Sequence, residues 1–207
     1  MRRLVLPLCL IAGTSLMAQS VRMNGGLQVG LGLPTGDFAD KKTSQGEFLG
    51  ANDGLGLHFG GHLDFNFTTH HQMRLIVNIN GFASKKQDIY DNLGFYDGTR
   101  QNAFGISQFG ADYVYNAGTP SRGGYFLAGL NLNQVKAKAE FSYYGDSEVT
   151  QSGRVGVRVG GGYNFNRVFS LEGHLNSVAV DKSGADGLGY DSLTWVSVSA
   201  VFRFGRP

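Results

Sequence analysis

The stretch "RVGVRVGGGYNFNRVFSLEGHLNS", residues 154–177, decides the fold. Before its central "NFN", valines alternate with arginines and glycines, and after it leucines alternate with charged and polar residues. Strict alternation places one kind of side chain on each face of a β-strand. Two such runs joined by a short polar segment are typical of a hairpin. The stretch therefore predicts two antiparallel strands whose polar face carries Arg154, Arg158, Glu172 and His174.

The same period of two continues through the rest of the chain, and no segment keeps a helical period over three turns. Further alternating segments lie at residues 27–33, 55–67, 73–82, 104–116, 125–135 and 194–204. Trp195 falls on the polar face of the last segment and departs from its pattern. With the hairpin these segments make eight strands joined by alternately long and short connections. The chain is therefore predicted to be all-β, an eight-stranded antiparallel up-and-down β-barrel.

The fourth alternating segment changes phase near Gln108. Phe104 and Ile106 have even numbers, whereas Phe109 and Tyr113 have odd ones. One extra residue in a strand produces such a shift, so we predict a β-bulge at this point.

Composition excludes one large class of function. The chain of 207 residues has 32 glycines, 12% aromatic residues and only 16% charged residues, which is below the usual quarter. The formal net charge of +2 is matched by Arg2 and Arg3 alone. The chain therefore lacks the basic surface that nucleic-acid binding needs, and we predict no nucleic-acid partner.

The first residues have the pattern of an export signal. Two arginines precede an apolar run, which ends at small Ala18 before Gln19. The run is shorter than the roughly 20 apolar residues of a membrane-spanning helix. Residues 1–18 are therefore predicted to be a cleaved signal peptide, and residues 19–207 the barrel domain. Cys9 lies within the signal, so no disulfide is expected in the mature chain.

Alternation alone leaves open whether the apolar face points into a soluble barrel or out into a membrane. Several segments reach the 9–11 or so residues of a tilted transmembrane strand. Aromatic residues gather near strand ends on the apolar face, as in an interfacial girdle. The polar face is rich in glycine and short side chains, which suits the narrow interior of eight strands. These features favour a transmembrane barrel with a filled polar lumen.

Two local motifs resemble those of a known family. "LGLPTGDFAD", residues 31–40, resembles the passage from the first strand into the first outer loop of eight-stranded outer-membrane barrels of the OmpA/OmpX/OmpW type. "VSVSAVFRF", residues 196–204, resembles their aromatic-ended last strand. This resemblance to the porin-like outer-membrane β-barrel superfamily implies long outer loops, short periplasmic turns and a Gram-negative outer membrane as location. It also implies contact with outer-membrane lipid, and recognition of Phe202 and Phe204 by the barrel assembly machinery.

Charged side chains on the polar face would lie inside such a barrel. If the hairpin closes through residues 164–166, paired positions sum to 330 and Arg158 faces Glu172. Buried charges need partners, so we predict a network in the lumen. Its predicted members are Asp64, Arg74, Asp112, Arg154, Arg158, Glu172, His174 and Arg203.

Sites for metals, cofactors or catalysis are not favoured by the spacing. His58 and His62 are four residues apart on a strand, about 13 Å, too far for two ligands of one ion. His174 and Ser177 fall on opposite faces, so they do not form a nucleophile and base. The glycines at 160–162 lie inside a strand and lack the lysine of a phosphate loop. We therefore assign no catalytic, cofactor or metal residue and predict that the protein is not an enzyme.

Two functions remain open. In the first, the barrel is a structural anchor that presents four long loops for contact with a surface ligand. In the second, it is a narrow channel or a carrier for small or hydrophobic molecules. Eight strands leave little free space inside, so the filled lumen favours the first.

Overall fold

The computed structural model describes residues 21–39, 51, 54–90, 94–119, 121–142, 145–183 and 187–204. The predicted signal peptide lies outside these residues. The elements are β1 (Arg22–Thr35), the 3-10 helix η1 (Gly36–Ala39), β2 (Gly56–Asn66), β3 (His71–Ala83), β4 (Gln87–Tyr90), β5 (Tyr96–Asn116), β6 (Gly123–Phe141), β7 (Ser147–Asn164), β8 (Phe169–Ala179) and β9 (Ser192–Phe204). Among the described residues, no helix has the length and apolar character needed to span a membrane.

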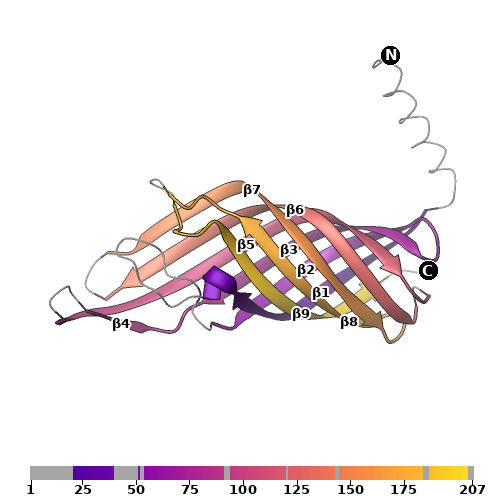
Figure 1. Ribbon diagram of the computed structural model, residues 1–207. Coiled ribbons are helices and arrows are strands. Elements are labelled where there is room, and N and C mark those ends of the chain that lie inside the picture. Colours follow the sequence, from indigo (N-terminus) through magenta and orange to yellow (C-terminus); the bar gives the residue numbers. More distant parts are fainter. Residues whose placement is uncertain are drawn as a thin grey trace, which may run out of the picture.

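Eight of the strands close into a ring (Figure 1). The order is β3-β2-β1-β9-β8-β7-β6-β5, and pairing between β5 and β3 completes it. Every neighbouring pair is antiparallel. The predicted eight-stranded antiparallel barrel is confirmed. β4 was not predicted, lies outside the ring and pairs only with β5 in the described sheet.

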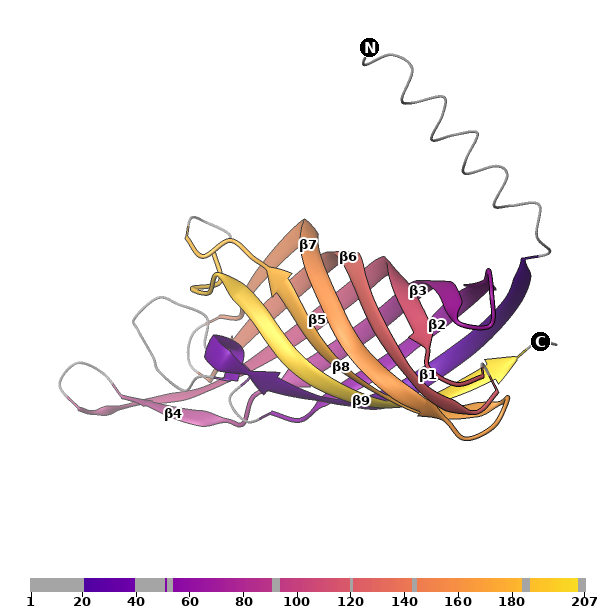
Figure 2. The same ribbon diagram turned by 45° about the vertical axis from the view of Figure 1, so that its right-hand side comes forward.

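The two ends of the barrel differ in their connections (Figure 2). At one end, which we call the turn end, short turns at residues 67–70, 117–122 and 165–168 join the strands, and Gly25 of β1 pairs with Phe204 of β9. At the other, the outer end, lie η1, β4 and the connection at 180–191. The predicted alternation of turns and outer connections is confirmed, except that residues 136–153, expected to be a loop, mostly extend β6 and β7.

Alternation along each strand sets what faces outward. On β7, Val157 is 49% exposed whereas Arg158 is 1% exposed. Leu130 on the neighbouring β6 is 64% exposed, and the Asn131 that follows it is buried. Over most of its height the barrel therefore presents apolar side chains outward and polar side chains inward, which is the arrangement of a transmembrane barrel.

The predicted bulge near Gln108 is wrong. Gln108 pairs with Asn78 of β3 and Asn133 of β6, and neither register shifts there. Phe104 and Ile106 are buried, on the same inward side as Gln108. The alternation of inward and outward side chains continues without a break. What changes is that the inward side chains become apolar and the outward ones polar.

A bulge does occur in β7, at Ser152 and Gly153 opposite Gln134, where the register with β6 shifts. Gly153 has a φ of 71°, a left-handed conformation that glycine adopts without strain.

The interior of the outer end is an apolar core. Phe38 of η1 is fully buried, with its ring centroid 5.2 Å from that of Phe82 and 5.0 Å from that of Phe104. Trp195 is also fully buried, 5.8 Å from Phe82. Its departure from the sequence pattern is explained, because the inward face of β9 is apolar at this height.

Candidate functional site: the polar network of the lumen

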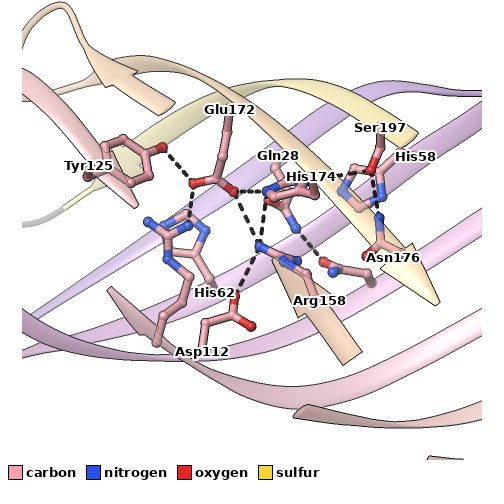
Figure 3. A network of polar contacts seen from close by, with 12 residues as sticks. Gln28, His58, His62, Asp112, Tyr125, Arg158, Glu172, His174, Asn176 and Ser197 are labelled. Atoms are coloured by element: carbon pink, nitrogen blue, oxygen red, sulfur yellow. Dashed lines mark hydrogen bonds and ion pairs between the residues drawn. The ribbon is translucent and has the colours of Figure 1, made fainter. Parts of the chain in front are cut away.

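Glu172 of β8 is the centre of a buried polar network (Figure 3). Its Oε2 accepts hydrogen bonds from Arg74 Nη1 on β3 and from the Tyr125 hydroxyl on β6, both at 2.5 Å. Its Oε1 accepts one from Arg158 Nη2 on β7 at 3.2 Å. Glu172 is 1% exposed. One carboxylate thus joins four strands across the interior of the barrel.

Arg158 links Glu172 to a second carboxylate. Its Nη2 lies 3.0 Å from Asp112 Oδ2 on β5. The contact between Arg158 and Glu172 does not come from the predicted register, which is wrong. Paired positions of β7 and β8 sum to 334 rather than 330, as in Arg158 with Asn176. Asn164 remains in β7 and pairs with Ser170, so the turn is centred near residue 167 rather than 165. In this turn Asn166 Oδ1 accepts hydrogen bonds from the backbone N–H groups of residues 168 and 169, both at 2.8 Å.

Asp64 and Arg74 occupy directly paired positions on β2 and β3. Arg74 Nε donates to Asp64 Oδ1 at 2.8 Å. Arg203 Nε lies 3.9 Å from Asp64 Oδ2. The guanidinium carbons of Arg74 and Arg203 lie 5.8 Å and 5.6 Å from the ring centroid of Tyr125. Tyr125 therefore packs against two cations while its hydroxyl donates to the central carboxylate.

Formal charges balance in this part of the lumen. Three carboxylates, those of Asp64, Asp112 and Glu172, contact three guanidinium groups, those of Arg74, Arg158 and Arg203. Removing one member leaves an uncompensated buried charge, which is far more costly than replacing a whole pair by apolar groups.

His174 has polar neighbours at both ring nitrogens. Its Nε2 contacts Glu172 Oε1, which only accepts, and also lies 3.2 Å from Arg158 Nη2, which only donates. Its Nδ1 lies 3.5 Å from the Ser197 hydroxyl. Ser197 in turn accepts from Asn176 Nδ2 at 3.0 Å. Amide, hydroxyl, imidazole and carboxylate form one chain of donors and acceptors across β8 and β9.

Ser197, His174 and Glu172 have the composition of a hydrolytic triad, which the spacing of residues within one strand does not reveal because Ser197 lies on the neighbouring strand. Ser197 lies opposite His174 on β9. All three side chains are 1–2% exposed, and Arg158 lies against the same imidazole nitrogen at 3.2 Å. The Ser197 hydroxyl is therefore closed off from solvent, and the three side chains form a buried hydrogen-bond chain.

Two sets of predicted residues lie outside the network. Arg154 pairs instead with Asp181 near the outer end, with Nη1 2.8 Å from Oδ1 and its side chain 28% exposed. The bulge at Gly153 directly precedes Arg154 and places it above the polar part of the lumen. Phe202 and Phe204 point outward at the turn end, 41% and 56% exposed, and their recognition by assembly machinery stays a prediction.

The histidines of β2 have polar partners or neighbours in the lumen. His58 Nδ1 is 2.7 Å from Asn80 Oδ1, and His62 Nε2 is 3.5 Å from Asp64 Oδ2. Within the described residues, no three histidine, cysteine, aspartate or glutamate side chains are grouped to hold a metal ion.

Aromatic residues at the outer end divide into two kinds. Phe38 and Tyr190 are buried in the outer core. Tyr90, Phe95 and Tyr96 are 60%, 69% and 55% exposed at the β4–β5 hairpin, which extends beyond the barrel (Figure 2). Phe48, Tyr143 and Tyr144 lie outside the described residues.

Solved structures share this architecture. Ail, the attachment invasion locus protein of Yersinia pestis, superposes with a TM-score of 0.53 over 88% of this chain and 99% of its own, at 11% identity. Ail was also solved with the heparin analogue sucrose octasulfate, at 10% identity and the same TM-score and coverage. The N-terminal β-barrel domain of Pseudomonas aeruginosa OprF matches with a TM-score of 0.49 and 14% identity over 89% of this chain and all of its own.

No protein-family model and no curated protein sequence matches the chain. The likeness to Ail therefore rests on structure, and at this identity it establishes the fold. The chain has the fold of the eight-stranded outer-membrane β-barrels of the OmpA/OmpX-like group.

Proposed function

We propose that this chain is a non-enzymatic protein of the outer membrane, with a closed lumen and a role at the cell surface. The observation that carries the proposal is that the interior is filled at two heights by two different chemistries. The charge network around Glu172 fills one height, and the apolar core around Phe38 fills the other.

The two fillings argue against the channel or carrier alternative. Arg74 on β3 lies across the ring from the adjacent strands β7 and β8, which carry Arg158 and Glu172, and the three side chains meet in the interior. A solute passing this level would have to separate buried ion pairs, which is costly without replacement partners. A hydrophobic molecule would have to displace the aromatic packing of Phe38 as well. Neither step is needed if the barrel only anchors the surface segments.

The β4–β5 hairpin is the part of the described chain best suited to surface contact. It extends past the barrel and exposes Tyr90, Phe95 and Tyr96 (Figure 2). Exposed clustered aromatics are typical of interaction sites.

Single-channel recording in planar bilayers tests the closed lumen. The protein should give no steady openings, whereas a variant with Phe38→Ala, Arg158→Ser and Glu172→Ser should conduct. Steady openings of the unmodified protein, with a conductance similar to that of the triple variant, would contradict the proposal.

Adhesion of expressing cells to a cultured epithelial monolayer tests the surface role. Replacing Tyr90, Phe95 and Tyr96 by serine should reduce adhesion while the heat-modifiable gel mobility of the barrel stays unchanged. Lys85→Ser, at an exposed site just before β4, is the matched control. Equal adhesion of wild type and the aromatic variant would remove the hairpin as the contact site.

A further inference from the structure

A groove of about 310 Å³ lies on the outward face of the barrel, below the outer core. Its wall residues come from four strands and are almost entirely apolar: Leu75, Phe109, Ala111, Leu130, Leu132 and Val155. The groove exists because Ala111 is small and lies directly between Leu75 and Leu130 in the sheet. Phe109 and Leu132 form its upper edge as the next outward pair. A hydrocarbon chain is the ligand that such a surface suits.

Polar groups follow immediately above the groove on the same outward face. Ser107 pairs with Gln134, and Gln134 Nε2 donates to Ser152 Oγ at 3.4 Å. These three residues replace the apolar side chains of the row below on β5, β6 and β7. They mark the height at which the surface leaves the hydrocarbon and meets lipid headgroups.

Lys136 is the next outward residue of β6 above Gln134. It is exposed, and its cross-strand neighbours are Gly105 and Thr150, which carry no charge. Among the described residues no carboxylate pairs with it, in contrast to Lys138, whose Nζ lies 2.8 Å from Glu140 and 2.9 Å from Asp146. These two hydrogen-bonded carboxylates raise the pKa of Lys138 and occupy its charge. Lys136 is thus the lowest cation on this face, with its charge available.

The spacing fits one lipid molecule. Lys136 lies four residues beyond Leu132, about 13 Å along the strand, and a lysine side chain can bend toward a headgroup. We propose that this face binds a phosphorylated lipid of the outer leaflet, with one acyl chain in the groove at Ala111 and the phosphate at Lys136. Ser107, Gln134 and Ser152 supply hydrogen bonds to the headgroup between them. The proposal concerns the lipid-facing wall and does not depend on the closed lumen.

The experiment places the refolded mature chain in nanodiscs of phosphatidylcholine and phosphatidylglycerol, and counts retained lipids by native mass spectrometry. Phosphatidylglycerol is the probe for a phosphorylated anionic lipid. The wild-type protein should prefer it about fivefold, the effect of one lysine near an anionic headgroup. Lys136→Gln should remove the preference, with Lys85→Gln as the matched control at another exposed lysine. A preference that survives Lys136→Gln, or is lost equally in Lys85→Gln, would overturn the headgroup assignment.

Filling the groove tests the acyl-chain part separately. Ala111→Phe should lower the number of retained lipids of either headgroup, while Ala200→Phe, at an outward position on β9, should leave it unchanged. Both substitutions point toward lipid, and an unchanged heat-modifiable gel mobility shows that the barrel has folded. Equal lipid retention by the two variants would exclude the groove as the binding site.

Discussion

The membrane-spanning part and the outer part of this barrel are built from the same strands with opposite chemistry. On β5, Phe109 faces outward and Gln108 inward, whereas one step further Ser107 faces outward and Ile106 inward. The register does not change between them. Alternation therefore indicates a strand. Which of its faces carries the apolar residues indicates whether lipid or water surrounds the strand. A strand passes from lipid to water by exchanging the chemistry of its two faces.

The two parts also hold together in different ways. In the membrane-spanning part the apolar face meets lipid, and the interior is stabilised by ion pairs and hydrogen bonds around Glu172. In the outer part polar side chains face outward and apolar side chains are buried inside, as around Phe38. Substitutions should therefore have opposite effects at the two heights.

The largest difference is expected at the centre of the polar network. Glu172→Gln keeps the shape but removes the charge that Arg74 and Arg158 share, so the free energy of unfolding should fall by about 3–5 kcal/mol. Urea unfolding of protein folded in lipid vesicles measures this, followed by the fluorescence of Trp195, the only tryptophan.

Glu140→Gln is the control, because Glu140 pairs with Lys138 on the exposed outer surface and should change stability little. An equally small effect of both substitutions would show that the lumen network is hydrated enough to need no charge balance.

A smaller difference is expected on the outward face of β7. Val157→Arg places a cation against lipid and should cost about 2–4 kcal/mol if the residue lies near the middle of the bilayer. Thr150→Arg, on the same face of the same strand but in the outer part, should cost at most about 0.5 kcal/mol. The same vesicle unfolding assay compares the two. If both variants are destabilised alike, the outer part of β7 also lies in lipid and the assignment of the two heights is wrong.

Most of the membrane-spanning part could be predicted from the sequence because there the period and the polarity agree. Its strands follow from alternation and its antiparallel order from the short connections, whereas the inward direction of Arg158 and Glu172 follows from strand length, aromatic strand ends and the small side chains of the polar face. The register of β7 with β8 does not follow from these features, because it depends on where the turn is centred, and the turn hydrogen bonds of Asn166 are not visible in the alternation.

The outer part was harder because its polarity is reversed. Phe104, Ile106 and Trp195 depart from a single rule of polar inside and apolar outside, so the sequence pattern predicts a bulge or an exception where the polarity of the two faces is in fact reversed. A signal was present, since the outward series Leu132, Gln134, Lys136 turns polar as the inward series turns apolar at Val135 and Ala137. The role of Tyr125 and the partnership of Ser197 with His174 depend on contacts between strands, which no single-strand pattern contains.

The smallest effect tests whether the outer interior is packed like a protein core. Ile106 is fully buried there, next to Val135 on β6. Ile106→Val removes one methylene group and should lower the free energy of unfolding by about 0.5–1.5 kcal/mol, as it does in a well-packed core. Ser107→Ala, one residue along and facing outward, should stay within about 0.5 kcal/mol of wild type. A cost at position 107 without one at 106 would mean that the outer interior is loosely filled, and the reversal of chemistry along β5 would then have no stabilising role.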